Sequence, residues 1–477
     1  MTPLPKASPS LSSCRLAGAA FIAGIFLFLF ASCATLPDVS TLQQRQAPKA
    51  SPAIVLASGA LKPAQQNARL ERMADKAGAT AILDRHLAAE QAISGAPLVA
   101  GNKVTLLHDG PLTMRAMMEA IEAARDHVNL ETYIIEADEV GQALAELLIR
   151  KATAGVRVNF IYDSVGAIGT PAEFFERLRT AGVHVLEYNP INPLKAERGW
   201  ELNQRDHRKL LVVDGRVAFT GGVNISRVYG RSAILQSKHR APPDDAREAA
   251  WRDTHMRIEG PVVAEFQKLF LDTWQRQTGE ELEGARYFPP LKAQGKALVR
   301  AVGSVAEAGD YSIFKMYVSA ITYADRYAHL TTAYFVPDRQ IVDALTAAAQ
   351  RGVDVKLIFP SFSDHDTLLY ASRSYYTELL AAGIRVYERK AAVLHAKTAV
   401  IDGVWSTIGS TNLDMRSFLH NDEINAVVLD VDFAERMEAL FQHDLAESTE
   451  IRADQWSRRG WYQRLREWMA RLFAYWL

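Results

Sequence analysis

Two short strings of this 477-residue chain place an imidazole, an ammonium group and a carboxylate at one fixed spacing. In each string a lysine lies two positions after a histidine, an aspartate lies five positions after the lysine, and an asparagine follows a pair of small residues further on. Alternate residues of an extended strand share a face, so the histidine and lysine of each string point the same way. The first string comprises His207, Lys209, Asp214 and Asn224, and the second comprises His395, Lys397, Asp402 and Asn412.

Together, these side chains suit chemistry on a phosphodiester. If the two strings met about a pseudo-two-fold axis, two imidazoles, two ammonium groups and two amides would converge on one point. The lysines and the asparagines Asn224 and Asn412 would hold the non-bridging oxygens of the phosphate. One histidine would attack phosphorus and the other would protonate the departing oxygen, with a covalent phosphohistidine between the two steps. This chemistry requires no metal or other cofactor, because the lysines supply the positive charge.

The elements that must position the two strings also occur twice. Each string surrounds an Asp-Gly pair flanked by β-branched residues, which predicts a hairpin. Upstream, strands and helices alternate in the same order at an offset of about 200 residues, with glycine at the helix ends. We therefore expect an α/β protein with two α/β sandwich halves, at 98–290 and 291–450, related by a pseudo-two-fold axis with the active site between them. The expected strands are 130–135, 155–162 and 181–186 in one copy and 330–335, 352–359 and 382–387 in the other.

The paired strings resemble those of the phospholipase D superfamily, over residues 98–448. Within that superfamily, further segments are similar to bacterial cardiolipin synthase. The resemblance implies a duplicated phospholipase D-type fold and transfer of a phosphatidyl group to phosphatidylglycerol, with His207 as the nucleophile and His395 as the acid and base. The donor would be phosphatidylglycerol or phosphatidylethanolamine, and the alternative is a hydrolytic phospholipase, phosphodiesterase or nuclease using the same histidines. The segments that carry the finer resemblance are 251–255, 258–261, 334–337, 370–375 and 412–418.

The resemblance also implies a carboxylate downstream of each string that orients its histidine. Asp253 matches this position for His207, and Glu423 matches it for His395. A carboxylate on one imidazole nitrogen fixes the tautomer and favours the imidazolium. We therefore expect Asp253 to pair with His207 and Glu423 with His395.

Two aspartates of the strings could have either a catalytic or a structural role, and one arginine has no assigned role. Asp214 and Asp402 belong to the catalytic motif of the superfamily, but an aspartate in an Asp-Gly turn can also serve the backbone alone. Arg208, between the histidine and lysine of the first string, has no counterpart in the second. We expect it to point outward and assign it no role.

Composition narrows the class of partner. The chain has 54 Lys and Arg against 55 Asp and Glu, so its formal net charge is −1. This balance argues against a nucleic-acid coat, and we expect no nucleic-acid partner. Only Cys14 and Cys33 are cysteines, which excludes a disulfide framework or a cysteine-built zinc site in the globular part. Nothing in the sequence indicates an oligomeric state.

The N-terminus has the pattern of an export signal. Lys6 and Arg15 precede an uncharged run at 16–32, and the run ends in a segment that resembles a bacterial lipobox, with Cys33 as the residue to be lipidated. The alternative is an uncleaved membrane anchor. Either case predicts a membrane-associated protein of the bacterial envelope that faces the periplasm. Residues 34–97 are expected to form a linker and an N-terminal extension, with the stretch up to Arg69 as a tether.

The C-terminal segment 451–477 is rich in tryptophan and arginine. It holds four of the eight tryptophans, and its six arginines outnumber two acidic residues. At 100° per residue, its apolar side chains gather on one face of a helix. We expect a basic amphipathic helix that lies on a membrane surface, and the alternative is a helix docked on the protein's own core. The residues of the apolar face are Trp461, Leu465, Trp468, Met469, Leu472, Tyr475 and Trp476.

Overall fold

The structure is a computed structural model, and it describes residues 35–46, 52–192, 201, 203–233, 249–390 and 392–475. Residues 38–477 form one unit, separate from residues 1–37, and the account below concerns that unit alone. The lipobox-like segment with Cys33 and the loop 234–248 lie outside the described residues.

The two halves have sheets with the same strand order, which confirms the predicted duplicated α/β fold. In both, three parallel strands lead into an antiparallel hairpin and two further antiparallel strands. The first sheet runs β6 (His184–Tyr188), β5 (Arg157–Asp163), β4 (His127–Thr132), β8 (Leu210–Val213), β9 (Val217–Gly221), β11 (His255–Glu259) and β3 (Leu98–Leu107). The second runs β16 (Arg385–Arg389), β15 (Asp354–Pro360), β13 (Tyr327–Thr331), β18 (Thr398–Ile401), β19 (Trp405–Gly409), β21 (Asn421–Leu429) and β12 (Ala297–Ser304).

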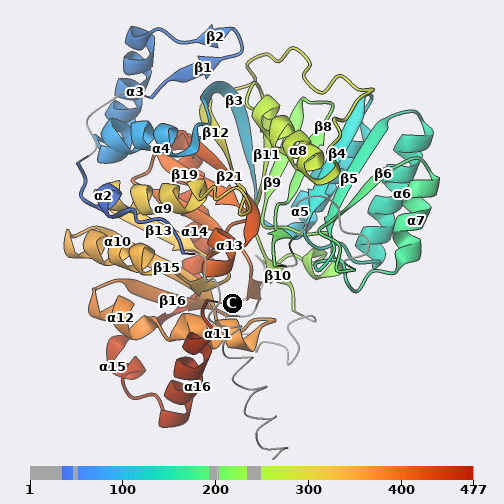
Figure 1. The fold of residues 1–477 in the computed structure, drawn as a ribbon. Coiled ribbons are helices and arrows are strands. Elements are labelled where there is room, and N and C mark those ends of the chain that lie inside the picture. The colour runs from blue at the N-terminus through green and yellow to red at the C-terminus, as the bar shows by residue number, and fades with distance from the viewer. Residues whose placement is uncertain are drawn as a thin grey trace, which may run out of the picture. The chain divides into compact units, whose positions relative to one another are not determined.

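The two sheets are joined where β3 pairs with β12 in antiparallel register. Figure 1 shows the halves side by side, with α6 (Glu139–Thr153) and α7 (Ala172–Thr180) outermost on one side and α9 (Ser312–Tyr323) and α10 (Arg339–Gln350) on the other. A single apolar cluster spans the junction and includes residues of α8 (Val263–Thr278) and α14 (Val431–Ala446), so the halves share a core. Burial of this shared surface stabilises the relative position of the halves.

The predicted hairpins form around the two Asp-Gly pairs. Asp214 and Gly215 have φ of 52° and 59°, and Asp402 and Gly403 have φ of 53° and 68°. Two consecutive left-handed residues make the tight turn that matches the twist of antiparallel strands, and aspartate tolerates this conformation better than most residues. The first strand of each hairpin, β8 or β18, starts at the residue that follows the lysine of its string.

The interpretation of residues 34–69 as a tether is wrong for the part that the structure describes. Strand β1 (Ile54–Leu56) pairs in parallel with β3 and antiparallel with β2 (Gly59–Ala60), and Ile54 is fully buried. Helices α2 (Ser40–Gln43), α3 (Pro63–Ala77) and α4 (Leu87–Ser94) belong to the same extension. Arg45 forms an ion pair with Asp325 of the second half. Strand β1 and helix α2 are too short to show a period, so their packing against the two halves, rather than local pattern, determines their structure.

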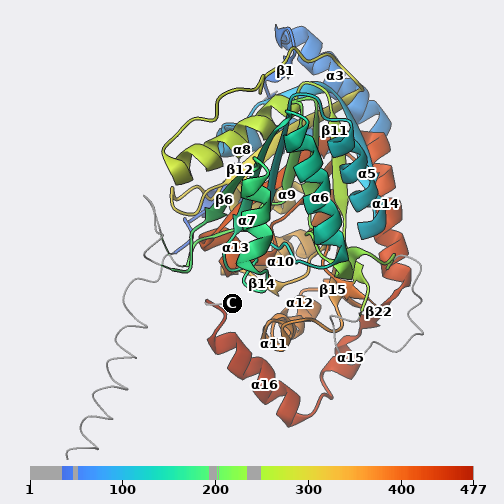
Figure 2. The same cartoon turned by 90° about the vertical axis from the view of Figure 1, so that its right-hand side faces the viewer.

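The C-terminal segment begins differently from the helix that we predicted. Strand β22 (Ser448–Ile451) pairs with β16, the short α15 (Ala453–Trp456) follows, and the amphipathic helix is α16 (Trp461–Leu472). Figure 2 shows α16 beneath α11 (Asp366–Arg373), against which it packs. No helix of the described chain has the length and apolar character to cross a bilayer.

The apolar face of α16 points away from the protein. Trp461 is 75% exposed and Leu472 is 62% exposed, whereas Glu467 on the opposite face is buried. The guanidinium of Arg466 lies 3.8 Å from the centroid of the Tyr370 ring of α11. The helix therefore docks through its charged face, and docking on the protein core through its apolar face is excluded.

Candidate active site

The first histidine is positioned by a strand pairing between the two halves. Strand β7 (Arg205–Asp206) of the first half pairs in parallel with the start of β21 in the second, with Asp206 opposite Asp422. The next residues along these chains are His207 and Glu423. The His207 amide donates to the Asp422 carbonyl at 2.9 Å, and His207 Nδ1 lies 2.9 Å from Glu423 Oε1.

The second histidine is positioned in the same way with the halves exchanged. Strand β10 (Trp251–Arg252) of the first half pairs in parallel with β17 (Val393–Leu394) of the second, with Arg252 opposite Leu394. The next residues are Asp253 and His395. The His395 amide donates to the Arg252 carbonyl at 2.8 Å, and His395 Nδ1 lies 2.7 Å from Asp253 Oδ2.

The predicted pairing of acids and histidines is therefore wrong. Glu423 holds His207 and Asp253 holds His395, so each carboxylate serves the histidine of the other half. The physical reason is the pair of parallel strand contacts, β7 with β21 and β10 with β17, which cross between the halves. Position relative to a motif along the chain does not reveal such a crossing.

The two lysines lie against the backbone beside their histidines. Lys209 Nζ donates to the His207 carbonyl at 2.6 Å, and Lys397 Nζ donates to the His395 carbonyl. Burial lowers the pKa of Lys209 to about 7 and that of Lys397 to about 8. The anion that would bind here favours the charged ammonium, because an opposite charge close by offsets the cost of burial.

Burial also governs the protonation of the histidines. It lowers the pKa of His207 to about 4, against the opposing effect of Glu423. Burial, together with Lys397, lowers the pKa of His395. Lys397 contributes to the shift at His207 and Lys209 to the shift at His395, so the two strings share one electrostatic site. Glu423 raises the pKa of His207 and Asp253 raises that of His395, so each carboxylate favours the imidazolium as expected, while burial favours the neutral ring.

The carboxyl groups behind the histidines remain ionised. Burial raises the pKa of Asp253 and Glu423, but the adjacent histidine, the nearby lysine and further hydrogen bonds together outweigh it, and both pKa values lie below their ordinary range. An ionised carboxylate accepts the Nδ1 hydrogen of its imidazole. The hydrogen of each imidazole therefore lies on Nδ1, toward its carboxylate, and Nε2 faces away from the carboxylate.

The two asparagines are not equivalent. Asn224 Oδ1 accepts the Ile134 amide at 3.2 Å, and its Nδ2 donates to the Tyr229 hydroxyl at 3.3 Å. The amide of Asn224 is thus committed to protein groups. Asn412 is buried and its Nδ2 donates to no described residue, so this amide is the one available to a phosphate oxygen.

Asp214 and Asp402 serve the backbone, and their assignment as catalytic residues is wrong on this geometry. The Asp214 carboxylate accepts the amides of Arg125, Asp126 and His127 at 2.8–3.2 Å. The Asp402 carboxylate accepts the amides of residues 325–327 and the hydroxyl of Thr80. Both carboxylates bind the chain just before a central parallel strand, β4 or β13, to the hairpin turn.

Arg208 is buried, which contradicts the expectation that it points outward. Its Nε donates to the Glu423 carbonyl at 3.1 Å, and its other nitrogens donate to Thr273 Oγ1 at 2.6 Å and to the Ser304 carbonyl at 2.8 Å. Arg208 thus fixes the backbone of the residue that holds His207. The alternation of polar and apolar residues gave no sign of this, because a buried charge needs partners from elsewhere in the chain.

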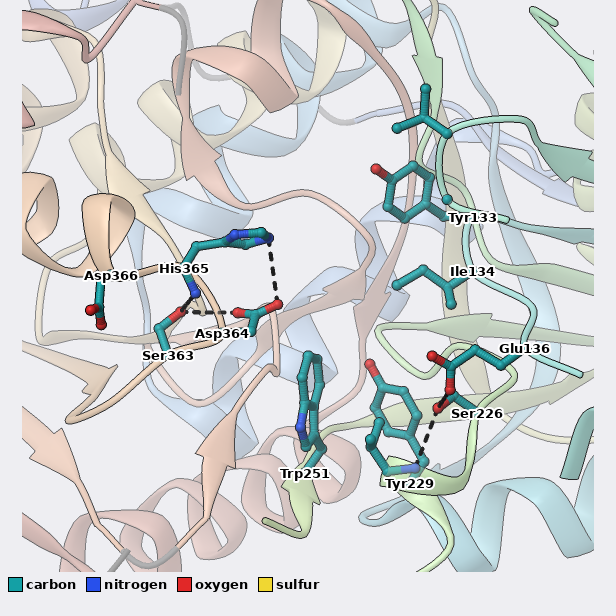
Figure 3. A pocket seen from close by; sticks show the side chains of 13 residues that line it. Tyr133, Ile134, Glu136, Ser226, Tyr229, Trp251, Ser363, Asp364, His365 and Asp366 are labelled. Carbon is teal, nitrogen blue, oxygen red and sulfur yellow. Dashed lines mark hydrogen bonds and ion pairs between the residues drawn. The ribbon is translucent and has the colours of Figure 1, made fainter. Parts of the chain in front are cut away.

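A pocket of about 610 Å³ opens beside the histidines, and its lining was not identified from the sequence. Tyr133 stands edge-on to His207 with ring centroids 5.0 Å apart, and Trp251 lies 5.1 Å from His395. Figure 3 shows Tyr133, Tyr229 and the Asp364 carboxylate facing the open space from different sides. Three carboxylates line the pocket, those of Glu136, Asp364 and Asp366. Among the described residues, no lysine or arginine lines it.

Comparisons with known proteins agree with this geometry. The sequence profile described as "Cardiolipin synthase, PLD-like domain" matches residues 117–232 and 317–445, which include both strings. The chain is 35% identical over 382 residues to the cardiolipin synthase of Geobacillus kaustophilus, covering 79% of this chain and 73% of that one. It is 36% identical over 387 residues to cardiolipin synthase A of Pseudomonas putida, covering 79% and 76%. The chain belongs to the cardiolipin synthase family.

A solved structure outside the close relatives has the same fold. The phosphatidylserine synthase of Haemophilus influenzae aligns with a TM-score of 0.59 at 13% identity, covering 81% of this chain and 96% of the other. As a member of the cardiolipin synthase family, the chain is a phosphatidyltransferase of the phospholipase D superfamily. Among the described residues, no three His, Cys, Asp or Glu side chains lie close enough together to hold a metal ion.

Proposed function

We propose that this protein makes cardiolipin by transferring a phosphatidyl group to the headgroup hydroxyl of phosphatidylglycerol. The observation that carries the proposal is the pair of imidazoles, each with Nδ1 held by a carboxylate of the other half at 2.7–2.9 Å. This arrangement leaves the Nε2 lone pair of each histidine available for the phosphodiester. Nucleophilic attack and proton transfer both need such a nitrogen.

In the first step, Nε2 of His207 forms a bond to phosphorus while the bond from phosphorus to the headgroup oxygen breaks. His395, protonated on Nε2 when the anionic substrate is bound, gives its proton to that oxygen. The displaced alcohol is glycerol from a phosphatidylglycerol donor or ethanolamine from a phosphatidylethanolamine donor. In the second step, His395 accepts the proton of a phosphatidylglycerol hydroxyl, and the hydroxyl oxygen displaces His207 from phosphorus.

Positive charge for both steps comes from Lys209 and Lys397, with Asn412 as a further donor to the phosphate. The lowered pKa values of the two lysines, about 7 for Lys209 and about 8 for Lys397, are those of the protein without substrate. Binding of a phosphodiester anion reverses the effect of burial, so the lysines are charged when they are needed.

The pocket supports the choice of headgroup. Glu136, Asp364 and Asp366 offer carboxylate oxygens that accept hydrogen bonds from the hydroxyls of a glycerol headgroup. The same oxygens suit the ammonium of an ethanolamine headgroup, so both donors stay in the proposal. A volume of about 610 Å³ lies within the range of small-molecule sites.

We also propose that the protein acts on a membrane surface of the bacterial envelope. The outward face of α16 exposes Trp461, Trp468 and Leu472, and arginines flank it. A helix with this composition partitions into the headgroup region of a bilayer, and a lipid chain on Cys33 would add a second contact. The lipid anchor and the periplasmic orientation follow from the sequence pattern alone.

The test is a lipid analysis of the full chain with vesicles of phosphatidylglycerol, with and without phosphatidylethanolamine. We expect cardiolipin by mass spectrometry, with loss of at least about 10³-fold in rate for His207→Ala. His443→Ala, a half-exposed histidine on α14, is the matched control and should retain activity. Phosphatidic acid without cardiolipin would establish hydrolysis and overturn the proposed transfer. Dependence on phosphatidylethanolamine would identify the donor.

The membrane contact has its own test. Leu465→Glu combined with Leu472→Glu places charge on the outward face of α16, where both side chains are at least 40% exposed. We expect this variant to sediment poorly with anionic vesicles while it still turns over a short-chain, water-soluble phosphatidylglycerol. Equal binding of the variant and the parent chain would contradict the role of α16.

A further inference from the structure

A tyrosine outside both strings contacts the catalytic machinery. The Tyr229 hydroxyl lies 3.1 Å from His395 Nδ1 and its ring is fully buried, edge-on to Trp251. Tyr229 also lines the pocket, and in Figure 3 its hydroxyl points into the open space between Asp364 and Ile134. Neither string contains this residue, and the superfamily resemblance described above assigns it no role.

The direction of each hydrogen bond at this hydroxyl can be worked out. His395 Nδ1 carries a hydrogen, because it lies 2.7 Å from the ionised carboxylate of Asp253. It therefore cannot accept a hydrogen bond from Tyr229. The amide of Asn224 is oriented by the Ile134 amide on its oxygen, so its Nδ2 is the atom that faces Tyr229 and donates.

The Tyr229 oxygen accepts from Asn224 Nδ2 and lies beside His395 Nδ1, whose single hydrogen is given to Asp253, so neither nitrogen accepts the hydrogen of the hydroxyl. Among the described residues, no oxygen accepts that hydrogen. A buried hydroxyl normally donates as well as accepts, so an unused donor that points into a pocket indicates a ligand oxygen.

The second half has no such group beside His207. The position five residues after Asn412 is Ser417 in α13 (Met415–Leu419). The Ser417 hydroxyl accepts a hydrogen bond from the backbone amide of Asn412 at 3.3 Å. Tyr133 stands edge-on to His207, but no hydroxyl of the described residues contacts an imidazole nitrogen of His207 as Tyr229 does at His395. His395 is the histidine that the proposed function uses as acid and base.

We propose that Tyr229 is a catalytic residue, whose hydroxyl donates a hydrogen bond to the phosphodiester on the side where His395 protonates the departing oxygen. Asn224 is then a positioning residue that acts through Tyr229. The proposal rests on the proposed function for the identity of the substrate. It adds one neutral donor to the charge that the lysines supply as the transition state forms.

The test compares two phenylalanine variants. Tyr229→Phe removes the hydroxyl and keeps the ring, and we expect kcat to fall about 10²-fold with little change in KM. Tyr317→Phe is the matched control, since the buried Tyr317 hydroxyl also receives an asparagine Nδ2 at 3.3 Å but contacts neither histidine. We expect this control to lose similar stability and to keep its kcat. The measured quantity is the total consumption of phosphatidylglycerol. The test of Tyr229 is therefore valid whether a phosphatidylglycerol hydroxyl or water displaces His207 from phosphorus.

Two further measurements separate a catalytic hydroxyl from a structural one. Fluorotyrosine at position 229 lowers the pKa of the phenol, and a donating hydroxyl should then add a basic limb to the pH profile at lower pH. Inorganic vanadate, used as a phosphate probe, should bind about tenfold more weakly to Tyr229→Phe than to Tyr317→Phe. Equal kcat and equal vanadate affinity in the two variants would overturn the proposal for Tyr229 and leave the proposed transfer intact. Failure of the parent chain to form cardiolipin would overturn the transfer alone.

Discussion

The two histidines lie in near-identical frames but have very different interiors behind them. Asp206 and Arg208 flank His207, and both are buried among charged groups, with Glu131 3.9 Å from Arg208. Leu394 and Ala396 flank His395, and both pack in an apolar cluster with Ile358 and Phe441. The repeated strand pairings therefore specify the positions of the reacting groups. The residues that flank each histidine can be either polar or apolar.

The polar backing requires its own balance of protons. Burial raises the pKa of Glu131, and burial together with the charge of Glu131 raises the pKa of Asp206 well above its ordinary value, whereas a hydrogen bond with Asp206 lowers the pKa of Glu131. Arg208 favours the ionised forms. The residues that flank His207 thus include a buried arginine and a carboxyl group with a raised pKa, whereas those that flank His395 are the apolar Leu394 and Ala396.

The largest effect should come from the crossed carboxylates. We expect Glu423→Gln and Asp253→Asn each to lower kcat about 10³-fold, because an amide in place of a carboxylate no longer enforces the Nδ1–H tautomer. Histidine-labelled ¹⁵N NMR locates the effect: Glu423→Gln should shift the His207 signals, and Asp253→Asn the His395 signals. If each substitution moved the histidine of its own half instead, the crossed arrangement would be refuted.

The difference between the interiors should show next, in stability. Arg208→Met leaves the carboxyl groups around it without a cation, and we expect the free energy of unfolding to fall by about 3–5 kcal/mol. Arg257→Met is the control, since Arg257 pairs with Glu259 near the surface, and its loss should be under about 1 kcal/mol. Denaturant midpoints measure both. Equal losses would mean that the buried network adds nothing beyond a surface ion pair.

The symmetric part of the comparison can be tested at the hairpin turns. Asp214→Asn and Asp402→Asn each weaken several backbone hydrogen bonds, and we expect a loss of about 1–3 kcal/mol for either. Turnover at a temperature well below unfolding should stay within about threefold of the parent chain. A loss of activity like that of the histidine variants would restore the aspartates to the chemistry.

The smallest expected effect concerns the lysines and pH. The pKa of Lys209 is about 7 in the folded protein against 10.5 unfolded, so its burial costs most below pH 7, where both states are protonated. Between pH 7 and 10.5 the folded state releases the proton first, and the cost declines. Lys209→Met should therefore raise the melting temperature by a few degrees at pH 6 and by less at pH 10. Lys397→Met should gain less, since its pKa is about 8.

Local patterns predicted the repeated strands, the two hairpins and the membership of the site, because each of these depends on nearby residues. Which acid holds which histidine depends on strand pairings between distant segments, with the paired residues 216 and 142 positions apart, and the spacing of a motif contains no information about such pairings. The burial of Arg208 and the role of the extension before β3 depend in the same way on partners far along the chain. Tyr229 lies five residues after Asn224, and an asymmetry between the strings at that position was the one available signal.

The crossed strand pairings restrict how this protein can evolve and be divided. A first half alone would contain His207 without its carboxylate, and a second half alone would contain His395 without its own. Two fragments, each inactive, should recover a complete site only when both types are mixed. A substitution near Asp253 alters the environment of His395 in the other half. The two halves therefore cannot diverge independently at the residues that position the histidines.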